Sequence, residues 1–320
     1  MISDNDLMEQ LQHTLAETNF SLPDKYRGKV RDNYSLETGR RLIITTDRIS
    51  AFDRILTTIP FKGQVLNQIS AFWFDKTKDI IENHVVDVPD PNVMIVKQCK
   101  TFPIEMVVRG YITGSAWRDY SAGKDISGIF LPKGLKKNQK FDVPVVTPST
   151  KADFGDHDIH ISREEILAKK LMCAKDYLAM EKAAMLLYKR GVEIAAKQGL
   201  ILVDTKYEFG IYNGKLIVVD EMHTPDSSRY WYLNSYAERF EKGEEPQILD
   251  KEFLRQWLIT EKNFMGDGEI PEIPTEIKLE VARRYIKAFE EITGTELKVE
   301  ENKNTLARIE ANLKGKGYLK

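Results

Sequence analysis

The chain has 320 residues, of which 42% are hydrophobic and 30% are charged, and its formal net charge is −2. This composition is ordinary for a globular protein, and the length is enough for two domains or one large one. The near-neutral charge argues against general nucleic-acid binding, and no apolar run reaches the length of a membrane span. Two cysteines are too few for a disulfide framework, and the acidic N-terminus lacks a signal-peptide pattern, so we predict a cytoplasmic protein.

The first 106 residues carry the pattern of an antiparallel lobe. A leucine stripe at helical spacing predicts a helix over residues 6–17. Short apolar runs predict strands over residues 41–46, 57–61 and 93–99, and an aromatic-rich segment predicts a buried helix over residues 62–76. Short strands at short intervals with few helices are typical of an antiparallel sheet, so we predict a first domain over residues 1–106.

Two polar loops of this lobe contain groups that suit a ligand. Residues 25–31 place Gly28 among basic side chains, and a glycine lets the backbone approach phosphate oxygens closely. A plain hairpin turn is the alternative interpretation, because the pattern matches neither a P-loop nor a dinucleotide fingerprint. The second loop, residues 46–53, is dense in side chains that can bind a ligand.

Residues 105–117 are predicted to cross from the first lobe to the second. The extended, apolar and slightly acidic segment over residues 105–107 can offer backbone groups to the edge of an adenine ring. Arg109 and the hydroxyl of Ser115 follow between glycines, and an arginine fork suits carboxylate or phosphate. A surface ion pair is the alternative role for Arg109.

Residues 123–148 form a loop-rich insertion with a solvated basic cluster, and a loop with two histidines and three aspartates follows. His157 and His160 suggest zinc, but no third nitrogen or sulfur ligand stands at metal-site spacing. We therefore favour a substrate or nucleotide loop there.

Helical patterns dominate the rest of the chain apart from one hairpin. Ser162 and Glu165 form a capping box, which opens a helical region that Gly199 ends. The region is too long for one ordinary helix, so we predict two, broken near residues 173–176. Three further helices are predicted as packing elements over residues 250–258, 276–293 and 304–314.

The hairpin carries the strongest functional signal in the chain. Two apolar runs flank Asn213-Gly214, the dipeptide most typical of a tight β-turn. Asp204, Lys206 and Glu208 alternate along the first strand and therefore share one face. Buried carboxylates are costly unless they bind a cation or a basic partner. An exposed face with ion pairs is the alternative, but the flanking runs have the pattern of strands buried on both faces.

The register of this hairpin decides whether Asp220 joins that face. A two-residue turn would pair Tyr212 with Lys215 and put Asp220 on the opposite face from Glu208. A three-residue loop with Gly214 as a left-handed bulge moves Asp220 to the face of Glu208. Because two carboxylates on one face can converge on a hydrated cation, we predict the bulged loop.

The chemistry of these groups indicates a magnesium nucleotide. Mg²⁺ prefers oxygen ligands and bridges one or two carboxylates to phosphates, and Glu208 with Asp220 is the best pair for this. Lys206 can hold a phosphate or acyl oxygen as a point charge. The groups that can recognise an anionic second substrate are Arg109, Ser115 and Arg229. The residues alone therefore predict Mg-nucleotide-dependent phosphoryl transfer to a small anionic acceptor.

Five stretches of the chain together resemble one known family. They are Gly28–Asp32, Thr46–Asp53, Arg109–Ser115, Leu202–Gly210 and Asp220–Arg229. In this order they resemble the SAICAR synthetases (phosphoribosylaminoimidazole-succinocarboxamide synthases). The resemblance implies an α+β fold with two lobes, a kinase-like antiparallel N-terminal sheet lobe and an ATP-grasp-like second lobe with C-terminal helices. The expected lobes are residues 1–106 and 107–320, with the nucleotide between them.

The resemblance also implies an ATP-dependent ligase of purine biosynthesis. It would join L-aspartate to the carboxylate of carboxyaminoimidazole ribonucleotide and release SAICAR, ADP and phosphate. That carboxylate would be phosphorylated first, because it does not react with an amine until one oxygen becomes a leaving group. The expected cofactors are ATP and Mg²⁺, and the expected partners are these small molecules, with neither nucleic acid nor a membrane. The chain resembles the longer form of the enzyme, so monomer and homo-oligomer both stay open.

Residue roles are implied in the same way. The implied nucleotide-binding residues are Gly28, Lys29, Val30, Arg31, Glu105, Met106, Val107 and Lys151. The implied substrate-binding residues are Ser50, Arg109, Ser115, Asp153, Asp226 and Arg229. The implied catalytic residues are Asp204, Lys206, Glu208 and Asp220, of which Glu208 and Asp220 are also the metal ligands. Within the first set, Lys29 and Arg31 would lie beside the phosphates and residues 105–107 beside the adenine.

Two other function classes stay open from the residues alone. A small-molecule or protein kinase shares the two-lobed logic, but no His-Arg-Asp motif precedes the sequence Asp153-Phe154-Gly155. A nucleotide-binding module without catalysis is the second alternative. Such a module would not need a lysine and two carboxylates on one face beside anion-binding arginines.

Overall fold

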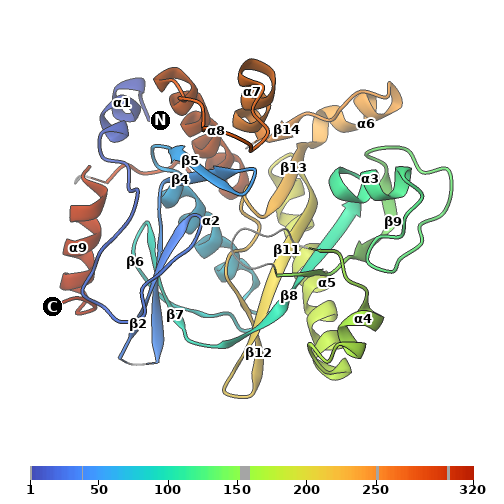
Figure 1. Cartoon of the computed structure of the whole chain (residues 1–320), viewed down its shortest axis with the longest axis horizontal. Coiled ribbons are helices and arrows are strands. Elements are labelled where there is room, and N and C mark those ends of the chain that lie inside the picture. Colours follow the sequence, from blue (N-terminus) through green and yellow to red (C-terminus); the bar gives the residue numbers. More distant parts are fainter. Residues whose placement is uncertain (1, 38, 152–158, 250–251, 301–302) are drawn as a thin grey trace. The chain divides into compact units, whose positions relative to one another are not determined.

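The computed structural model describes residues 2–37, 39–151, 159–249, 252–300 and 303–320 (Figure 1). The chain divides into two compact units. Unit 1 comprises Met1–Phe72, Val85–Gln98 and Asp250–Lys320, and unit 2 comprises Trp73–His84 and Cys99–Leu249. This division differs from the expected lobes 1–106 and 107–320, chiefly because the C-terminal helices pack within unit 1. An amphipathic pattern shows that a helix has a buried face but does not show what buries it.

An antiparallel sheet forms the framework of unit 1. Its strands, in the order in which they pair, are β1 (Tyr26–Arg27), β2 (Arg31–Leu36), β3 (Arg40–Thr45), β7 (Val93–Lys97) and β6 (Val85–Asp90). A separate hairpin consists of β4 (Arg48–Ala51) and β5 (Arg54–Thr58). The buried core on one face of the sheet contains Tyr34, Leu42, Ile44, Val93 and Ile95. The predicted antiparallel N-terminal sheet is therefore confirmed.

The helices of unit 1 are α1 (Asp4–Leu11), α2 (Lys62–Thr77), α7 (Glu252–Lys262), α8 (Thr275–Thr293) and α9 (Thr305–Gly315), with the end of α2 in unit 2. In Figure 1, α9 lies beside β6 and buries Ile309 and Leu313 in the sheet core. Gly294 ends α8 with φ 70°, as predicted. α1 is shorter than the predicted helix over residues 6–17. The chain leaves the helix early, and the N–H of Leu15 donates instead to the Asp47 carboxylate at 2.7 Å.

A larger antiparallel sheet forms the framework of unit 2. Its main path runs through β10 (Ser149–Thr150), β8 (Lys100–Tyr111), β11 (Leu200–Tyr212), β13 (Ser228–Tyr232) and β14 (Ile248–Leu249). Two further strands complete it, β9 (Lys140–Val146) beside β8 and β12 (Lys215–Val219) beside the far end of β11. Most side chains of β8 and β11 are buried on both faces, which explains their nearly continuous apolar runs.

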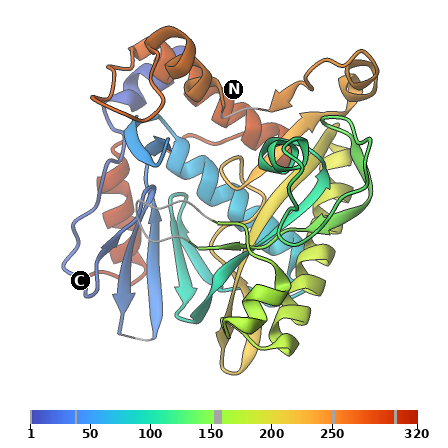
Figure 2. The same cartoon turned by 45° about the vertical axis from the view of Figure 1, so that its right-hand side comes forward.

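The helices of unit 2 are α3 (Gly114–Ser121), α4 (Arg163–Ala168), α5 (Ala174–Lys197) and α6 (Leu233–Glu241). Ser162 and Glu165 form the predicted capping box at the start of α4, and the predicted break separates α4 from α5. Figure 2 shows α5 lying along the sheet, where it packs on β11 and β8. Across the described ranges, no helix is long and apolar enough to cross a membrane.

The connection between β11 and β12 contradicts the predicted three-residue loop. Tyr212 pairs with Lys215, so Asn213 and Gly214 form a two-residue turn. Their φ angles are 50° and 76°, and two successive left-handed residues match the right-handed twist of the flanking strands without a bulge. Gly214 therefore has the predicted positive φ, but the register is that of the regular ladder.

Candidate active site

One face of β11 carries the charges that the alternating pattern predicted. Asp204 and Glu208 are 6% and 5% exposed, so this is not a solvated face with surface ion pairs. Each faces a charged residue on β8, since Asp204 pairs with Arg109 and Glu208 pairs with Glu105. The face therefore has two ends about 13 Å apart along the strand at 3.3 Å per residue, named here the Asp204 end and the Glu208 end.

At the Glu208 end, two lysines form ion pairs with two buried carboxylates. The Lys151 Nζ lies 2.5 Å from Glu208 Oε2, and the Lys206 Nζ lies 2.5 Å from Glu105 Oε1. The Lys206 Nζ is also 3.8 Å from Glu208 Oε1. Burial lowers the pKa of Lys206, but the carboxylates of Glu105, Glu208 and Asp220 outweigh it and hold this pKa above its usual range. Burial also lowers the pKa of Lys151, but the carboxylates of Glu208 and Asp220 raise it overall, so both lysines are cationic.

Asp220 joins this end by a different route from the predicted one. The β11–β12 ladder ends at Val219, opposite Glu208, and a continued strand would turn Asp220 to the other face. Asp220 instead has φ 67°, a left-handed conformation that takes the chain out of the strand. Burial and then the Asp220 carboxylate raise the pKa of Glu208 to about 7, although Lys151 and Lys206 act to lower it. The two carboxylates thus interact electrostatically despite the regular ladder.

At the Asp204 end, two arginines surround one carboxylate. Asp204 lies 3.6 Å from Nη1 of Arg109 and 3.4 Å from Nε of Arg229. Arg109 also donates from Nε to Thr147 Oγ1 at 2.8 Å and from Nη2 to Ser115 Oγ at 3.2 Å. The structure therefore brings the predicted substrate-binding residues Arg109, Ser115 and Arg229 together.

The start of α3 completes this cluster. Gly114 has φ +57°, and a Cβ there would lie 2.0 Å from Nη1 of Arg229, so the guanidinium rests on bare backbone. Ser115 stands in the first turn of α3, and free N–H groups at a helix N-terminus favour anions. The Oδ2 of Asp204 is buried and accepts no hydrogen bond, since its ion-pair partner, Nη1 of Arg109, is 3.6 Å away. Two guanidinium groups, a helix start and a free acceptor together suit an anionic ligand that also carries N–H or O–H groups.

The segment Glu105–Val107 does not have the role predicted for its backbone. Glu105 pairs with Glu208 on one side and with Ser149 on the other. The Val107 carbonyl accepts a hydrogen bond from Thr147 N at 2.8 Å, and Met106 is fully buried. The prediction of free backbone groups for an adenine edge is therefore wrong, because β8 lies inside the sheet and is paired along both edges. The side chain of Glu105 is the part that reaches the site.

Sequence reasoning missed Thr147 as a contributor to this face and gave Glu105 a different role, in nucleotide binding. Thr147 comes from a loop whose sequence gives no sign of its contact with Arg109. Glu105 did leave a signal, because a lone carboxylate within an apolar run needs a buried cation as partner.

In unit 1, the Gly28 loop is a hairpin connection between β1 and β2. The Gly28 N–H donates to the Arg31 carbonyl at 2.8 Å, and the Val30 carbonyl accepts from Thr46 N at 2.9 Å. The plain hairpin turn left open by the sequence is thus the local geometry. The half-buried side chain of Lys29 forms an ion pair with Asp53.

The polar loop at residues 46–53 supports the Gly28 loop from inside. Arg48 is 1% exposed and donates to the carbonyls of Gly28 and Lys29, both at 3.0 Å, and to Asp32 at 2.9 Å. Asp47 is equally buried and accepts from the N–H of Gly63 at 2.8 Å. These two charged groups are structural, so the interpretation of the loop as a set of ligand-binding side chains fails for them.

The other predicted site residues lie as follows. Ser50 is half-buried in β4 of unit 1, and Asp226 is half-buried in a turn before β13 of unit 2. Asp153 and His157 lie outside the described residues. His160 Nε2 lies 3.6 Å from Asp119 Oδ2, an ion-pair distance that offers no zinc geometry.

The carboxylates suit a magnesium ion better than a metal held entirely by protein. Within the described parts of the chain, no group of three or more His, Cys, Asp or Glu side chains could hold a metal ion. Mg²⁺ commonly uses only one or two protein carboxylates and completes its shell with phosphates and water. Glu208 and Asp220 are two carboxylates of the kind that Mg²⁺ uses, and the ammonium groups of Lys151 and Lys206 lie beside Glu208.

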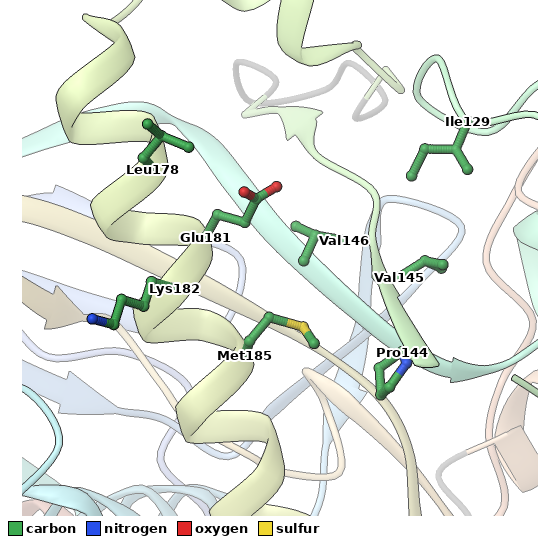
Figure 3. A pocket seen from close by; sticks show the side chains of 8 residues that line it. All are labelled: Ile129, Pro144, Val145, Val146, Leu178, Glu181, Lys182 and Met185. Atoms are coloured by element: carbon green, nitrogen blue, oxygen red, sulfur yellow. The ribbon is translucent and has the colours of Figure 1, made fainter. Parts of the chain in front are cut away.

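A cavity of about 580 Å³ lies elsewhere in unit 2 (Figure 3). Its lining residues, from α5, β9 and the loop before β9, are Ile129, Pro144, Val145, Val146, Leu178, Glu181, Lys182 and Met185. The cavity contains none of the predicted site residues, and its wall is mainly apolar. It is therefore separate from the β11 face.

Comparison with known proteins gives one consistent result. A family model described as SAICAR synthetase matches residues 24–269. The phosphoribosylaminoimidazole-succinocarboxamide synthase of Bacteroides fragilis is 51% identical over 306 residues, which cover 93% of this chain and 97% of that protein. The corresponding synthase of Legionella pneumophila is 50% identical over 295 residues, 90% of this chain and 93% of that protein.

A solved structure agrees with the sequence matches. SAICAR synthase from Saccharomyces cerevisiae, complexed with SAICAR, superimposes with a TM-score of 0.79 at 36% identity. The match covers 89% of this chain and all of that chain. The α+β fold with a kinase-like antiparallel N-terminal lobe, an ATP-grasp-like second lobe and C-terminal helices is thereby confirmed.

Proposed function

The chain belongs to the SAICAR synthetase family, and from this premise we propose that the two ends of the β11 face divide the work of the ligation. The enzyme is an ATP-dependent ligase that joins L-aspartate to the carboxylate of carboxyaminoimidazole ribonucleotide, a step of purine biosynthesis. The kinase and the non-catalytic binding module are therefore set aside.

The reaction requires an activated carboxylate. A carboxylate oxygen of the ribonucleotide attacks the γ-phosphorus of ATP, the bond to the bridging oxygen breaks, and ADP leaves. The aspartate amine then attacks the carbonyl carbon, loses a proton and expels phosphate. All three reactants are anionic, so the protein contributes mainly positioning and charge neutralisation.

We assign the ribonucleotide to the Asp204 end. Arg109 and Arg229 present guanidinium forks, and Ser115 stands at the N-terminal turn of α3, a combination that suits a phosphate group. The observation that carries this assignment is the buried Oδ2 of Asp204, which has no hydrogen bond and lies 3.6 Å from Nη1 of Arg109. A buried acceptor without a donor costs about 1–3 kcal/mol, which a hydroxyl or amino group of the substrate would recover.

We assign the phosphoryl chemistry to the Glu208 end. Glu208 and Asp220 would hold Mg²⁺, which when bound neutralises charge on the phosphates of ATP. Lys206 would hold a transferring or acyl oxygen as a point charge. Lys151, whose Nζ lies 2.5 Å from Glu208 Oε2, would compensate the charge of this carboxylate when no metal is bound.

In unit 1, the Gly28 loop is proposed to meet the nucleotide phosphates through Lys29 and Arg31. Arg48 holds the carbonyls of Gly28 and Lys29 from inside. This support keeps the loop in one conformation while the Lys29 side chain stays half-exposed beside Asp53. A rigid backbone with a basic side chain at the surface suits a phosphate chain.

The variant Arg229→Lys tests the assignment of the Asp204 end. Lysine keeps the charge but loses the fork that reaches Asp204 and rests on Gly114, so we expect the KM for ribonucleotide to rise about tenfold. The KM for ATP and the kcat should change little, as measured by ribonucleotide-dependent ADP release. Arg190→Lys is the matched control, because Arg190 pairs with Asp79 outside this cluster and should leave all constants unchanged. A rise in the KM for ATP instead would contradict the assignment.

A further inference from the structure

We propose that Glu105 is a positioning residue that holds the ammonium group of Lys206 off Glu208 and so leaves Glu208 available to a divalent cation. This inference rests on the proposed function of Glu208 as a metal ligand. It gives the side chain of Glu105 a role in the reaction that its backbone, paired on both sides within the sheet, does not have.

The register of β8 and β11 creates the need for such a residue. Glu105 and Glu208 are directly opposite each other, so their side chains share one face, and like charges in that arrangement repel. Lys206 pairs with Val107, one step along the same face, and reaches back between the two carboxylates. Its Nζ could pair with either of them.

The observed distances show which of the two carboxylates pairs with the Lys206 ammonium. The Lys206 Nζ is 2.5 Å from Glu105 and 3.8 Å from Glu208. Both carboxylates are buried to a similar degree, with side chains 4% and 6% exposed, so burial does not explain the choice. Glu208 already has Lys151 at 2.5 Å, and each lysine therefore has one close carboxylate.

Removing the charge of Glu105 would change this arrangement. Of the two carboxylates within ion-pair distance on the strand pair, the ammonium of Lys206 would keep only Glu208, and it would move the short distance onto that carboxylate. It would then compete with a divalent cation for the same oxygen atoms. Residues that orient a metal ligand typically change metal affinity by about 10–100-fold when they are mutated, so we expect Glu105→Gln to weaken cation binding about tenfold.

The test measures cation binding without turnover. Mn²⁺ serves as the probe, and the unbound ion is counted by electron paramagnetic resonance with ADP present and no ribonucleotide. Glu105→Gln should raise the Kd for Mn²⁺ about tenfold, whereas Glu105→Asp keeps the charge and should stay close to the parent protein.

A double variant separates positioning from mere structural support. In Glu105→Gln with Lys206→Met, the competing ammonium is absent, so Mn²⁺ affinity should return to that of the parent although ligation stays defective. A structural role for Glu105 would give no such recovery. If Glu105→Gln does not fold, Lys206→Met alone decides the matter, because it should bind Mn²⁺ at least as tightly as the parent.

Two further variants make the outcomes distinguishable. Asp90→Asn removes another buried carboxylate that pairs with a cation, Arg308 at 3.0 Å in unit 1, and should lower stability without changing Mn²⁺ affinity. Glu208→Gln should abolish the Mn²⁺ site, and unchanged binding there would refute the proposed metal site itself. If Glu208→Gln does abolish Mn²⁺ binding, two results would refute only the positioning role of Glu105. One is a Kd for Mn²⁺ in Glu105→Gln equal to that of the parent, and the other is a double variant whose Mn²⁺ affinity does not recover.

Discussion

Two buried charge clusters of this protein look alike in sequence, but they differ in how many of their polar atoms have hydrogen-bond or ion-pair partners. In unit 1, Arg48 has backbone carbonyls and the Asp32 carboxylate for its guanidinium, and both side chains are almost fully buried. On the β11 face of unit 2, Asp204 Oδ2 lacks a donor, and Lys206 remains 31% exposed beside a carboxylate it does not bind closely.

The difference separates a structural network from a candidate catalytic one. A buried network with every group bonded gives rigidity and has no capacity left for a ligand. A network that leaves a buried acceptor without a hydrogen bond carries an energetic cost that a ligand can relieve. The number of charges in a motif therefore says less about function than the state of their hydrogen bonds.

The largest expected effect concerns the satisfied cluster. Arg48→Met leaves Asp32 buried without its cation and removes the donors that hold the Gly28 loop, so we expect a loss of about 3–5 kcal/mol of unfolding free energy. Urea unfolding of both proteins measures this loss. Lys29→Met is the matched control, because its pair with Asp53 is about one-third exposed and should contribute less than about 1 kcal/mol. Equal losses of unfolding free energy in Arg48→Met and Lys29→Met would contradict the structural role assigned to the Arg48 network.

The next effect concerns the unsatisfied cluster. Glu208→Gln should reduce kcat by about a hundredfold or more, since it removes charge where the metal is proposed to bind. The melting temperature should change little, because burial and Asp220 already disfavour the ionised form of Glu208. Steady-state kinetics and calorimetry check the two halves of this prediction. Glu181→Gln, on the wall of the separate cavity, is the control and should leave turnover unchanged. A variant that fails to fold would make Glu208 structural and break the comparison.

The smallest effect is a pH dependence within unit 1. Burial raises the pKa of Asp47 to about 6 in the folded protein, although the N–H groups of Leu15 and Gly63 lower it, whereas an unfolded chain has the ordinary value of 3.8. Between these values the folded state binds more protons, so the contribution of Asp47 to stability is greatest below 3.8 and is lost as pH rises through 6. Relative to Asp47→Asn, the parent should gain on the order of 1–3 kcal/mol of unfolding free energy between pH 7 and pH 4. Urea titrations across that range measure the gain, and a difference independent of pH would show that Asp47 stays ionised in the fold.

The sequence alone determined the elements whose causes are local. The Ser162–Glu165 capping box, the Gly294 stop and the alternation of Asp204, Lys206 and Glu208 each depend on neighbouring residues in the chain. The resemblance of five stretches to one family was equally local, and it led to the function. These features follow from backbone and side-chain geometry over a few residues, so a reader of the sequence can predict them.

Only the tertiary structure decided the features that depend on distant partners. The turn at Asn213-Gly214 has the regular register, and Asp220 leaves the strand in a left-handed conformation in place of the predicted bulge. The C-terminal helices belong to unit 1, and the carboxylate of Glu105 faces Glu208 across two strands about 100 residues apart in sequence. Whether a buried polar group has a hydrogen-bond partner depends on which distant residues the fold places beside it. The charge pattern of the hairpin therefore marked the right face, and the paired strands and their lysines decided how it is arranged.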